Sequence, residues 1–422
     1  MREMKDSGIE WIGQIPKHWE VHPVYAYFEE GKTKNYRMQE QNLLSLSYGR
    51  IIRKDINTNG GLLPASFNTY NVVEAGDIII RPTDLQNDKR SLRTGLVKEQ
   101  GIITSAYIDL RPKDNVNSKY YHYLLHSYDV IKVFYNMGNG VRQGLNFSEF
   151  AKLLLLEPTT VEQQQIADYL DTKCSEIDAT AEDIQKEITL LEDYKKSLVY
   201  NVISNGINHS IYSTENDKVW GNLPQGWMLV DIKYLFEIVK RIAGKEGYDV
   251  LSVTQKGLKI KDITSGDGQL ADNYCGYQFV YPTDYVMNHM DLLTGWVDCS
   301  ELFGVTSPDY RVFRLIDRSA HNLVYYKYVM QCCYMNKIFY SLGQGVSNLG
   351  RWRLQTSSFN NFKVPVPPKD EQDEIADYLD SKCSEIDAII ADKKRQRGIL
   401  ADYKKSLIYE YVTGKKEVPI NE

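Results

Sequence analysis

The sequence contains no uninterrupted apolar run of 18 residues, which is about the length that a membrane-spanning helix needs. Its first residues, MREMKDSGIEWIG, lack the apolar stretch of a secretory signal peptide. The six cysteines form neither a CxxC pair nor a cluster with histidine, which argues against a zinc site and a disulfide framework. These absences predict a cytoplasmic chain with reduced thiols, no metal site and no membrane association.

Catalytic motifs are also missing. The chain has no GxxxxGK[ST] loop of a P-loop nucleotide site and no HExxH metal-binding pair. No glycine-rich loop is matched by an N/D-P-P-[FY] tetrapeptide, and VPVPP at 364–368 lacks the acidic or amide residue that a methyl-transfer site needs. The sequence therefore predicts a binding protein rather than an enzyme.

The net charge of −6 is unevenly distributed along the chain. Residues 1–157 hold 20 basic and 18 acidic residues, and 207–366 hold 16 and 15. Residues 158–206 hold 4 basic and 10 acidic residues, and 367–422 hold 10 and 13. The two larger segments are thus near neutral and can still concentrate basic side chains on one face, as phosphate binding requires.

One stretch of the chain occurs twice. EQQQIADYLDTKCSEID at 162–178 and EQDEIADYLDSKCSEID at 371–387 agree at 14 of 17 positions and lie 209 residues apart. The match continues at the same offset through LEDYKKSLVY (191–200) and LADYKKSLIY (400–409). A self-match at a constant offset indicates a duplicated architecture.

The duplication extends beyond this stretch. IGQIPKHW (12–19) resembles WGNLPQGW (220–227), and FYNMGNGV (134–141) resembles FYSLGQGV (339–346), whereas the interior of each half diverges. Short runs of Val, Ile, Tyr and Phe predict short strands in a mixed sheet, and residues 118–136 have helical periodicity. We expect an α+β fold with two homologous mixed α/β domains, 1–157 and 207–366, long helices over 158–206 and 367–416, and a tail over 417–422.

The repeated stretch is the clearest predicted helix. Thr160 or Asp370 is a suitable N-cap, and the apolar positions alternate in steps of four and three, as in a coiled coil. We expect the copies to pair as an antiparallel coiled coil, more loosely at DKKRQRG (392–398); two independent helices, each lying on its own domain, are the alternative. The predicted interface residues are Ile166, Leu170, Ile177, Ile184, Ile188, Leu191, Leu198, Ile375, Leu379, Ile386, Leu400 and Leu407.

Candidate nucleic-acid contacts occur where the duplicated framework diverges. Arg and Lys suit the acceptors of guanine, and Asn and Gln suit adenine. For any one residue, a solvated loop side chain is the simpler interpretation, but the candidate segments occupy matching places in both halves. The candidates are Lys89, Arg90, Arg93, Arg142 and Gln143 in the first half, and Asn288, His289, Asn348, Arg351 and Arg353 in the second.

The whole chain resembles the DNA specificity subunits of type I restriction-modification systems. The resemblance rests on GIEWIGQIPKHW, its echo WGNLPQGW, the EQxxIADYLD helix openings and the DYKKSLV or DYKKSLI helix ends. It implies two target recognition domains that each read half of a bipartite double-stranded DNA sequence. It also implies an antiparallel helix pair that separates them and acts as a ruler for the spacer.

The resemblance has consequences for partners and cofactors. It implies that the helices dock two modification subunits, which carry S-adenosylmethionine, that restriction subunits join the assembly, and that this chain holds no cofactor. An insertion near Glu182–Leu191 should change only the spacer, and Arg142→Ala and Arg351→Ala should impair different half-sites. A single-chain DNA methyltransferase and a coiled-coil scaffold without DNA are the alternatives.

Overall fold

The computed structural model describes residues 2–57, 64, 66–83, 85, 92–137, 144–208, 211–263, 271–345 and 352–419, apart from the side chains of residues 136, 214 and 215. The chain forms two compact units. The first unit comprises Met1–Ile184 with Arg395–Glu422, and the second comprises Gln185–Lys394. Both long helices run from one unit into the other: α3 spans Thr160–Asn205 and α8 spans Lys369–Val412.

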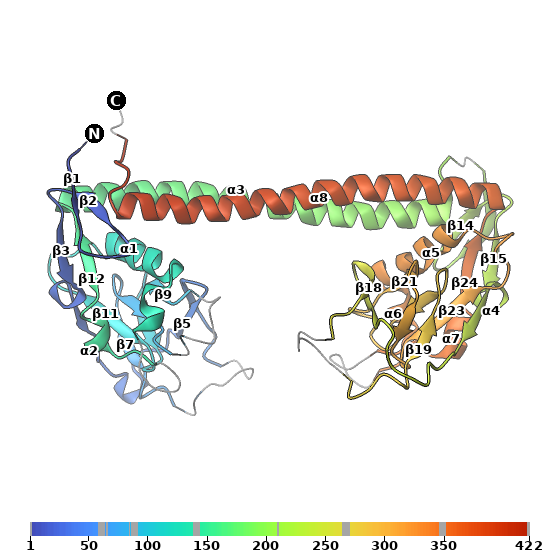
Figure 1. The fold of residues 1–422 in the computed structure, drawn as a ribbon, viewed down its shortest axis with the longest axis horizontal. Helices are drawn as coiled ribbons and strands as arrows, with labels where there is room; N and C mark the ends of the chain where they lie inside the picture. Colours follow the sequence, from blue (N-terminus) through green and yellow to red (C-terminus); the bar gives the residue numbers. More distant parts are fainter. Residues whose placement is uncertain are drawn as a thin grey trace. The chain divides into compact units, whose positions relative to one another are not determined.

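The first unit is built from short strands and few helices (Figure 1). Its strands are β1 (Met4–Asp6), β2 (Gln14–Pro16), β3 (Glu20–Pro23), β4 (Phe28–Glu30), β5 (Leu44–Ser47), β6 (Arg50–Arg53), β7 (Asn71–Val73), β8 (Ile78–Ile80), β9 (Thr94–Leu96), β10 (Gly101–Ile103), β11 (Ile108–Pro112) and β12 (Leu154–Glu157). Its helices besides α3 and α8 are η1 (Val24–Ala26), η2 (Tyr36–Met38), α1 (Ser118–Val130), η3 (Val133–Asn136) and α2 (Phe147–Phe150).

The second unit repeats this order. Its strands are β13 (Tyr212–Asp217), β14 (Gly221–Pro224), β15 (Met228–Asp231), β16 (Phe236–Val239), β17 (Leu251–Thr254), β18 (Gly257–Ile260), β19 (Gln278–Val280), β20 (Tyr285–Met287), β21 (Val297–Cys299), β22 (Gly304–Thr306), β23 (Arg311–Leu315) and β24 (Lys363–Val366). Its remaining helices are α4 (Ile232–Leu235), α5 (Leu323–Met335), α6 (Ile338–Ser341) and α7 (Thr356–Asn360).

Both units share one sheet topology. The main sheet has strand order β4-β11-β8-β9 in the first unit and β16-β23-β20-β21 in the second, and smaller pairs such as β7–β10 and β19–β22 recur as well. Every strand pair among the described residues is antiparallel, with one isolated parallel bridge in each unit, Leu43–Ile102 and Val250–Val305. The described main sheets are therefore antiparallel, and the two parallel bridges involve the smaller pairs that contain β10 and β22.

The predicted helix over 118–136 is shorter than expected. α1 ends at Val130, and Lys132 adopts a left-handed conformation with φ 65° before η3 begins. The second unit breaks at the matching place, where Lys337 has φ 56° between α5 and α6. A left-handed residue interrupts the helical hydrogen bonds, so periodicity alone overstated the length of the helix.

The start of α3 also differs by one residue from the expectation. Thr159, rather than Thr160, supplies the cap, since its hydroxyl oxygen accepts from the backbone N–H of Glu162 at 3.3 Å. The Glu162 carboxylate accepts in return from the Thr159 backbone N–H at 3.1 Å, which completes a capping box. α8 begins at Lys369, so Asp370 lies inside its first turn instead of capping it.

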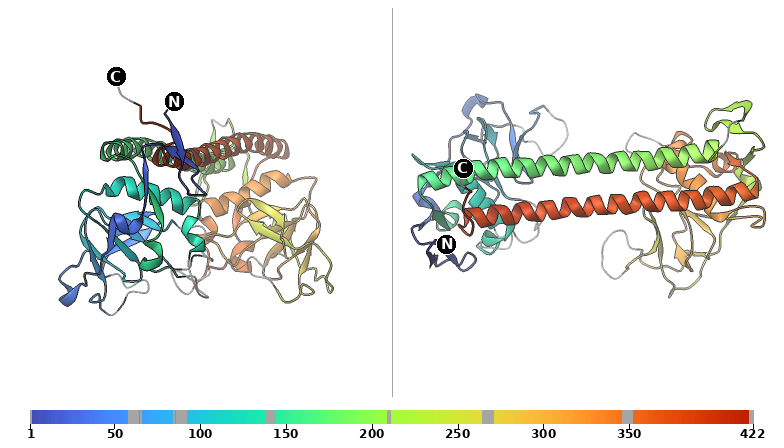
Figure 2. Two further views of the ribbon diagram at one scale, coloured as in Figure 1. Left: turned by 60° about the vertical axis from the view of Figure 1, so that its left-hand side comes forward. Right: turned by 90° about the horizontal axis from the view of Figure 1, so that it is seen from above.

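The two long helices pair antiparallel, as predicted, and lie side by side in both views (Figures 1 and 2). The same ion pair occurs once in each unit: Lys404 Nζ lies 2.7 Å from Asp178 Oδ1, and Lys195 Nζ lies 2.6 Å from Asp387 Oδ2. Of the predicted interface residues, Leu191, Leu198 and Leu400 are half-buried, and the others are buried.

Each helix end also completes a domain core. Ile166, Leu170 and Ile177 of α3 pack into the core of the first unit together with Tyr411 and Val412 from the end of α8. In the second unit the matching residues include Ile375 and Leu379 of α8 with Val199, Val202 and Ile203 of α3. Helix pairing and packing on a domain are therefore not alternatives, because each helix does both.

The charged stretch at 392–398 is held by ion pairs rather than by apolar packing. Lys393 Nζ lies 2.5 Å from Glu187 Oε2, and Lys394 Nζ lies 3.1 Å from Glu192 Oε1. Such exposed pairs contribute about 0–1 kcal/mol each. The acidic middle of α3 and the basic middle of α8 are thus complementary, which explains why the repeat diverges there.

Candidate nucleic-acid interface

A loop joins the last two strands of the main sheet in each unit. This hairpin loop spans 81–93 between β8 and β9 in the first unit, and 288–296 between β20 and β21 in the second. The antiparallel pairing of these strands brings the two ends of each loop together, with Ile80 opposite Thr94 and Met287 opposite Val297. The framework is shared, while the loops differ in length and sequence.

A second segment lies against each hairpin loop. This connecting segment spans 137–146 between η3 and α2, and 342–355 between α6 and α7. Its backbone is bonded to the hairpin loop at the same place in both units: Leu145 N–H donates to Pro82 O, and Leu354 N–H donates to His289 O, both at 3.0 Å. In each unit a described residue of the connecting segment is therefore bonded to the hairpin loop beside the main sheet.

The structure brings three of the predicted contact residues together. Asn288 and His289 are in the second hairpin loop, and Arg353 is exposed on the connecting segment beside it. Lys89, Arg90, Arg142, Gln143, Asn348 and Arg351 lie outside the described residues, although they belong to the same four segments.

Arg93 does not have the exposed position that a base contact needs. Its side chain is 0% exposed, its guanidinium donates to Thr83 O at 2.5 Å, and it lies 5.0 Å from the ring centre of Tyr135. This burial counts against the predicted base contact. A basic residue at the end of a divergent loop can anchor that loop instead of reading DNA, and sequence alone does not separate these roles.

His289 is a neutral group in a basic environment. Burial, followed by the nearby Arg311 and Arg353, lowers the pKa of His289 to about 4. The imidazole is consequently uncharged at neutral pH and offers one donor and one acceptor, which suits a base edge better than a phosphate. Its Nδ1 is buried and has no hydrogen-bond partner among the described residues.

Arg311 is the residue that sequence reasoning missed. It begins β23 opposite Met287 and is 5% exposed. Its Nη2 donates to Leu354 O at 3.1 Å and to Thr356 Oγ1 at 3.3 Å. The available signal was a charged residue at an inward-facing position of the strand-like run YRVFRLI, which is unusual for a buried strand.

The helix pair carries two equivalent apolar patches. In the second unit Leu190 and Tyr194 of α3 are 68% and 58% exposed, and in the first unit Ile399 and Tyr403 of α8 are 61% and 53% exposed. Both pairs are four residues apart on one helical face, and they are counterparts at the 209-residue offset. We call these pairs the helix patches.

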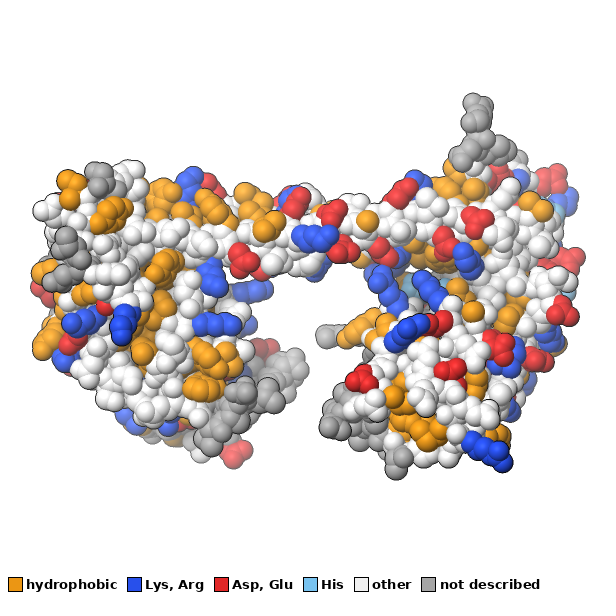
Figure 3. All heavy atoms as spheres, turned by 180° about the vertical axis from the view of Figure 1, so that it is seen from behind, with side chains coloured by type: hydrophobic (Ala, Val, Ile, Leu, Met, Phe, Trp, Pro, Cys, Tyr) orange, Lys and Arg blue, Asp and Glu red, His pale blue; other side chains and the backbone are white. Residues whose placement is uncertain are grey.

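A lysine accompanies each helix patch. Glu385 and, more weakly, Tyr194 raise the pKa of Lys382, while Glu176 and, more weakly, Tyr403 raise that of its counterpart Lys173. Hydrophobic, basic and acidic side chains are exposed together along the helices (Figure 3). No helix among the described residues is long and apolar enough to cross a membrane.

A pair of buried carboxylates lies in the main sheet of the first unit. Burial, and then the neighbouring Asp77 carboxylate, raises the pKa of Asp109 to about 7. Arg111 lies 3.4 Å from Asp77 Oδ2 and 3.9 Å from Asp109 Oδ2, so one cation serves two acids. The folded chain thus retains a proton on Asp109 that the unfolded chain releases near pH 4.

We expect Asp109→Asn to stabilise the first unit by about 1–3 kcal/mol at pH 8. Because the folded-state pKa of Asp109 is raised, its contribution to stability falls as pH rises from about 4 to about 7, and asparagine avoids this loss. Thermal unfolding at pH 5 and pH 8 measures the effect, which should be larger at pH 8. Arg111→Gln is the control and should destabilise, since it leaves both buried carboxylates without their shared cation. A less stable Asp109→Asn variant at pH 8 would contradict this interpretation.

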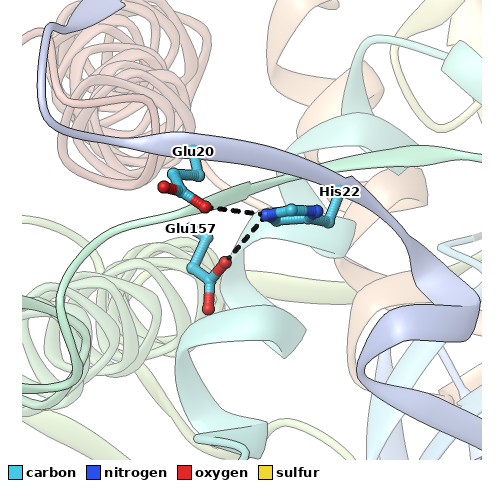
Figure 4. Close-up of side chains that lie close together, drawn as sticks. All are labelled: Glu20, His22 and Glu157. Atoms are coloured by element: carbon cyan, nitrogen blue, oxygen red, sulfur yellow. Dashed lines mark hydrogen bonds and ion pairs between the residues drawn. The ribbon is translucent and has the colours of Figure 1, made fainter.

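One group of side chains has the composition of a metal site (Figure 4). Glu20 on β3 is directly opposite Glu157 on β12, and His22 Nε2 lies 3.0 Å from Glu20 Oε2 and 3.4 Å from Glu157 Oε2. It is the one such group in the described part of the chain. Opposed carboxylates repel each other, and the His22 ring lies between these two. The absence of a metal site thus stays a prediction.

Comparison with known proteins gives consistent matches. The family model described as "Type I restriction modification DNA specificity domain" matches residues 30–190 and 224–396. The type I restriction enzyme MjaVIII specificity subunit of Methanocaldococcus jannaschii is 23% identical over 342 residues, which cover 76% of this chain and 75% of that protein.

Solved structures share the architecture. A chain from the structure described as "Structural basis underlying complex assembly and conformational transition of the type I R-M system" has a TM-score of 0.67 at 13% identity, covering 95% of this chain and 99% of its own length. The HsdS subunit from Thermoanaerobacter tengcongensis has a TM-score of 0.49 at 13% identity, covering 95% and 98%. The first of these likenesses supports the fold.

Proposed function

Because the chain belongs to the family of type I restriction-modification DNA specificity proteins, we propose that its two domains, 1–157 and 207–366, each read one half of a bipartite target. The chain is a DNA specificity subunit and has a recognition role rather than a catalytic one. The observation that carries the two-domain proposal is the surface formed by the hairpin loop and the connecting segment. It recurs on the same sheet framework with a different sequence in each unit.

Different surfaces on one framework support an asymmetric target. The hairpin loop and connecting segment carry Lys89, Arg90, Arg142 and Gln143 in the first domain, and Asn288, His289, Asn348, Arg351 and Arg353 in the second. We propose these residues as base or phosphate contacts. The chemistry differs between the domains, with more basic groups in the first and a neutral histidine beside arginines in the second, so the half-sites should differ.

The helix pair supports a ruler for the spacer between the half-sites. Each helix is anchored in both units, since its first half packs with one core and its last turns pack with the other. The ion pairs Lys404–Asp178 and Lys195–Asp387 set the register of the two helices. Helix length between the domains should therefore determine how many base pairs separate the half-sites.

The two helix patches support docking of two identical partners. Equivalent apolar pairs on an otherwise charged surface are suited to two copies of one protein rather than to one unsymmetrical partner. We propose that modification subunits bind there, bringing S-adenosylmethionine, and that restriction subunits join the complex on double-stranded DNA. We propose that the chain acts in the cytoplasm.

Methylome sequencing of a strain that carries the chain and its modification subunit tests the function. We expect one asymmetric motif with two defined halves and a constant undefined spacer. The control strain carries the modification subunit alone and should lack this methylation. A continuous palindromic motif would contradict two different readers, and methylation that persists without the chain would contradict its specificity role.

A further inference from the structure

Arg311 is a buried cation of the second unit. Its guanidinium lies within 4.0 Å of no carboxylate oxygen in the described part of the chain. Its guanidinium contacts the Leu354 carbonyl, the Thr356 hydroxyl, the Met287 sulfur at 3.8 Å and the face of Phe359, whose ring centre is 4.5 Å away. A buried charge without a counterion lowers the stability of the folded state. The presence of Arg311 at this buried position therefore points to a functional role.

The Arg311 side chain remains charged in this environment. Burial, partly opposed by Tyr334, lowers its pKa to about 10, which still leaves the guanidinium protonated at neutral pH. Leu354 and Thr356 stand at the end of the connecting segment and the start of α7. Leu354 is also the residue whose N–H binds the hairpin loop at His289. One guanidinium thus holds the point where the two divergent segments meet.

Arg93 makes a comparable contact in the first unit, but it belongs to a different element of the fold. It ends the hairpin loop, whereas the position matching Arg311, opposite Ile80, is occupied by Ile108. Its guanidinium holds the Thr83 carbonyl next to Pro82, and Pro82 accepts the bond from Leu145. Both arginines therefore anchor the junction of hairpin loop and connecting segment, one from the loop and one from the sheet.

The same tyrosine position supports the junction in both units. The guanidinium of Arg93 lies over the ring of Tyr135, and Trp352 packs against the matching Tyr340 with ring centres 4.9 Å apart. The tyrosine is the same in both halves, but the side chain that packs against it is an arginine in the first and a tryptophan in the second. The two domains therefore use different side chains to hold their hairpin loop and connecting segment together.

We propose that Arg93 and Arg311 are positioning residues for DNA recognition, each shaping the surface that reads the half-site of its own domain. The proposal rests on the proposed function, since it assumes that the linked segments are the reading surface. Arg311 has a further effect, because its uncompensated charge adds positive potential directly behind that surface and favours the approach of DNA. Neither side chain needs to touch a base.

The test uses the full chain in complex with its modification subunits. Binding is measured by competition with duplexes that carry both half-sites, or with one half-site scrambled. For Arg311→Met we expect discrimination at the second-domain half-site to fall about tenfold or more, with the other half-site unaffected. Arg93→Met should give the reverse pattern. The two variants are controls for each other, because a general loss of folding would affect both half-sites.

Two further variants separate positioning from simple stability. Arg311→Lys keeps the charge but lacks the planar fork that reaches both Leu354 and Thr356, so it should lose discrimination and keep the salt dependence of binding. Arg311→Met should lose discrimination and also show a shallower salt dependence. Arg314→Met, an exposed arginine of the same strand paired with Glu237, is the matched control and should change neither.

Several results would overturn the proposal. These are unchanged discrimination in both methionine variants, loss at the same half-site in both, or equal loss at both half-sites in each. A failure of the proposed function is distinguishable, because the unmodified complex would then show no dependence on one or other half-site before any substitution was made.

Discussion

Lengthening both long helices by one heptad is expected to lengthen the DNA spacer and leave both half-sites unchanged. The design duplicates residues 182–188 of α3 and the matching 391–397 of α8, where the chain passes from one compact unit to the other. Seven residues add about 10.5 Å of helix and preserve the four-three alternation of apolar positions. Since B-DNA rises about 3.4 Å per base pair, the spacer should grow by up to about three base pairs.

The measurement is methylome sequencing of strains that carry either chain. A control with unchanged length replaces residues 182–188 by other helix-forming residues while keeping Ile184 and Ile188, and should keep the original spacer. Duplication in α3 alone should destabilise the chain instead, because the ion pairs Lys195–Asp387 and Lys404–Asp178 cannot then form in one register. A changed half-site with the original spacer would refute the ruler.

Replacing the apolar residues of the helix patches by glutamate is expected to abolish docking of the modification subunits. Leu190→Glu with Tyr194→Glu should remove one copy, and Ile399→Glu with Tyr403→Glu should remove the other. Apolar and aromatic residues at the centre of an interface contribute about 2 kcal/mol or more each, so each double variant should weaken its site about a thousandfold. The fourfold variant should lose methylation activity altogether.

Native mass spectrometry of the chain mixed with its modification subunit measures the stoichiometry directly. We expect two copies on the unmodified chain, one on each double variant and none on the fourfold variant. Tyr234→Glu changes a tyrosine that is as exposed as those of the patches but belongs to α4 rather than to either long helix, and should keep two copies. Two copies on either double variant would contradict docking at that patch.

The architecture was predictable wherever the two halves repeat each other. The offset of 209 residues between matching stretches indicated two equivalent domains and two equivalent helices, and Ile166 and Leu170 are buried as their spacing implied. The repeat did not reveal that the helix ends also enter the domain cores. The sequence predicted Leu198 and Leu407 as part of a coiled-coil seam. An apolar stripe on a helix does not show whether that stripe packs against another helix or against a domain core.

The segments that we propose as the interface could be found from the sequence, but the roles of their side chains could not. Divergence at matching positions located the hairpin loops and connecting segments, because framework residues are constrained and loop residues are not. The roles of individual cations were not accessible. Arg93 and Arg353 are both arginines in divergent segments, yet one is buried over a tyrosine ring and the other is exposed. Only the packing around each side chain decides between anchoring and reading.

The way the helix ends complete the domain cores has a consequence during translation. The core of the second unit draws on residues between Val199 and Cys383, so it can close soon after that stretch leaves the ribosome. The core of the first unit combines Ile9 through Ile177 with Leu407, Ile408, Tyr411 and Val412, which are synthesised much later. At about 5–20 residues per second, the nascent first domain waits roughly 10–50 s for its last helix, exposed meanwhile to chaperones and proteases.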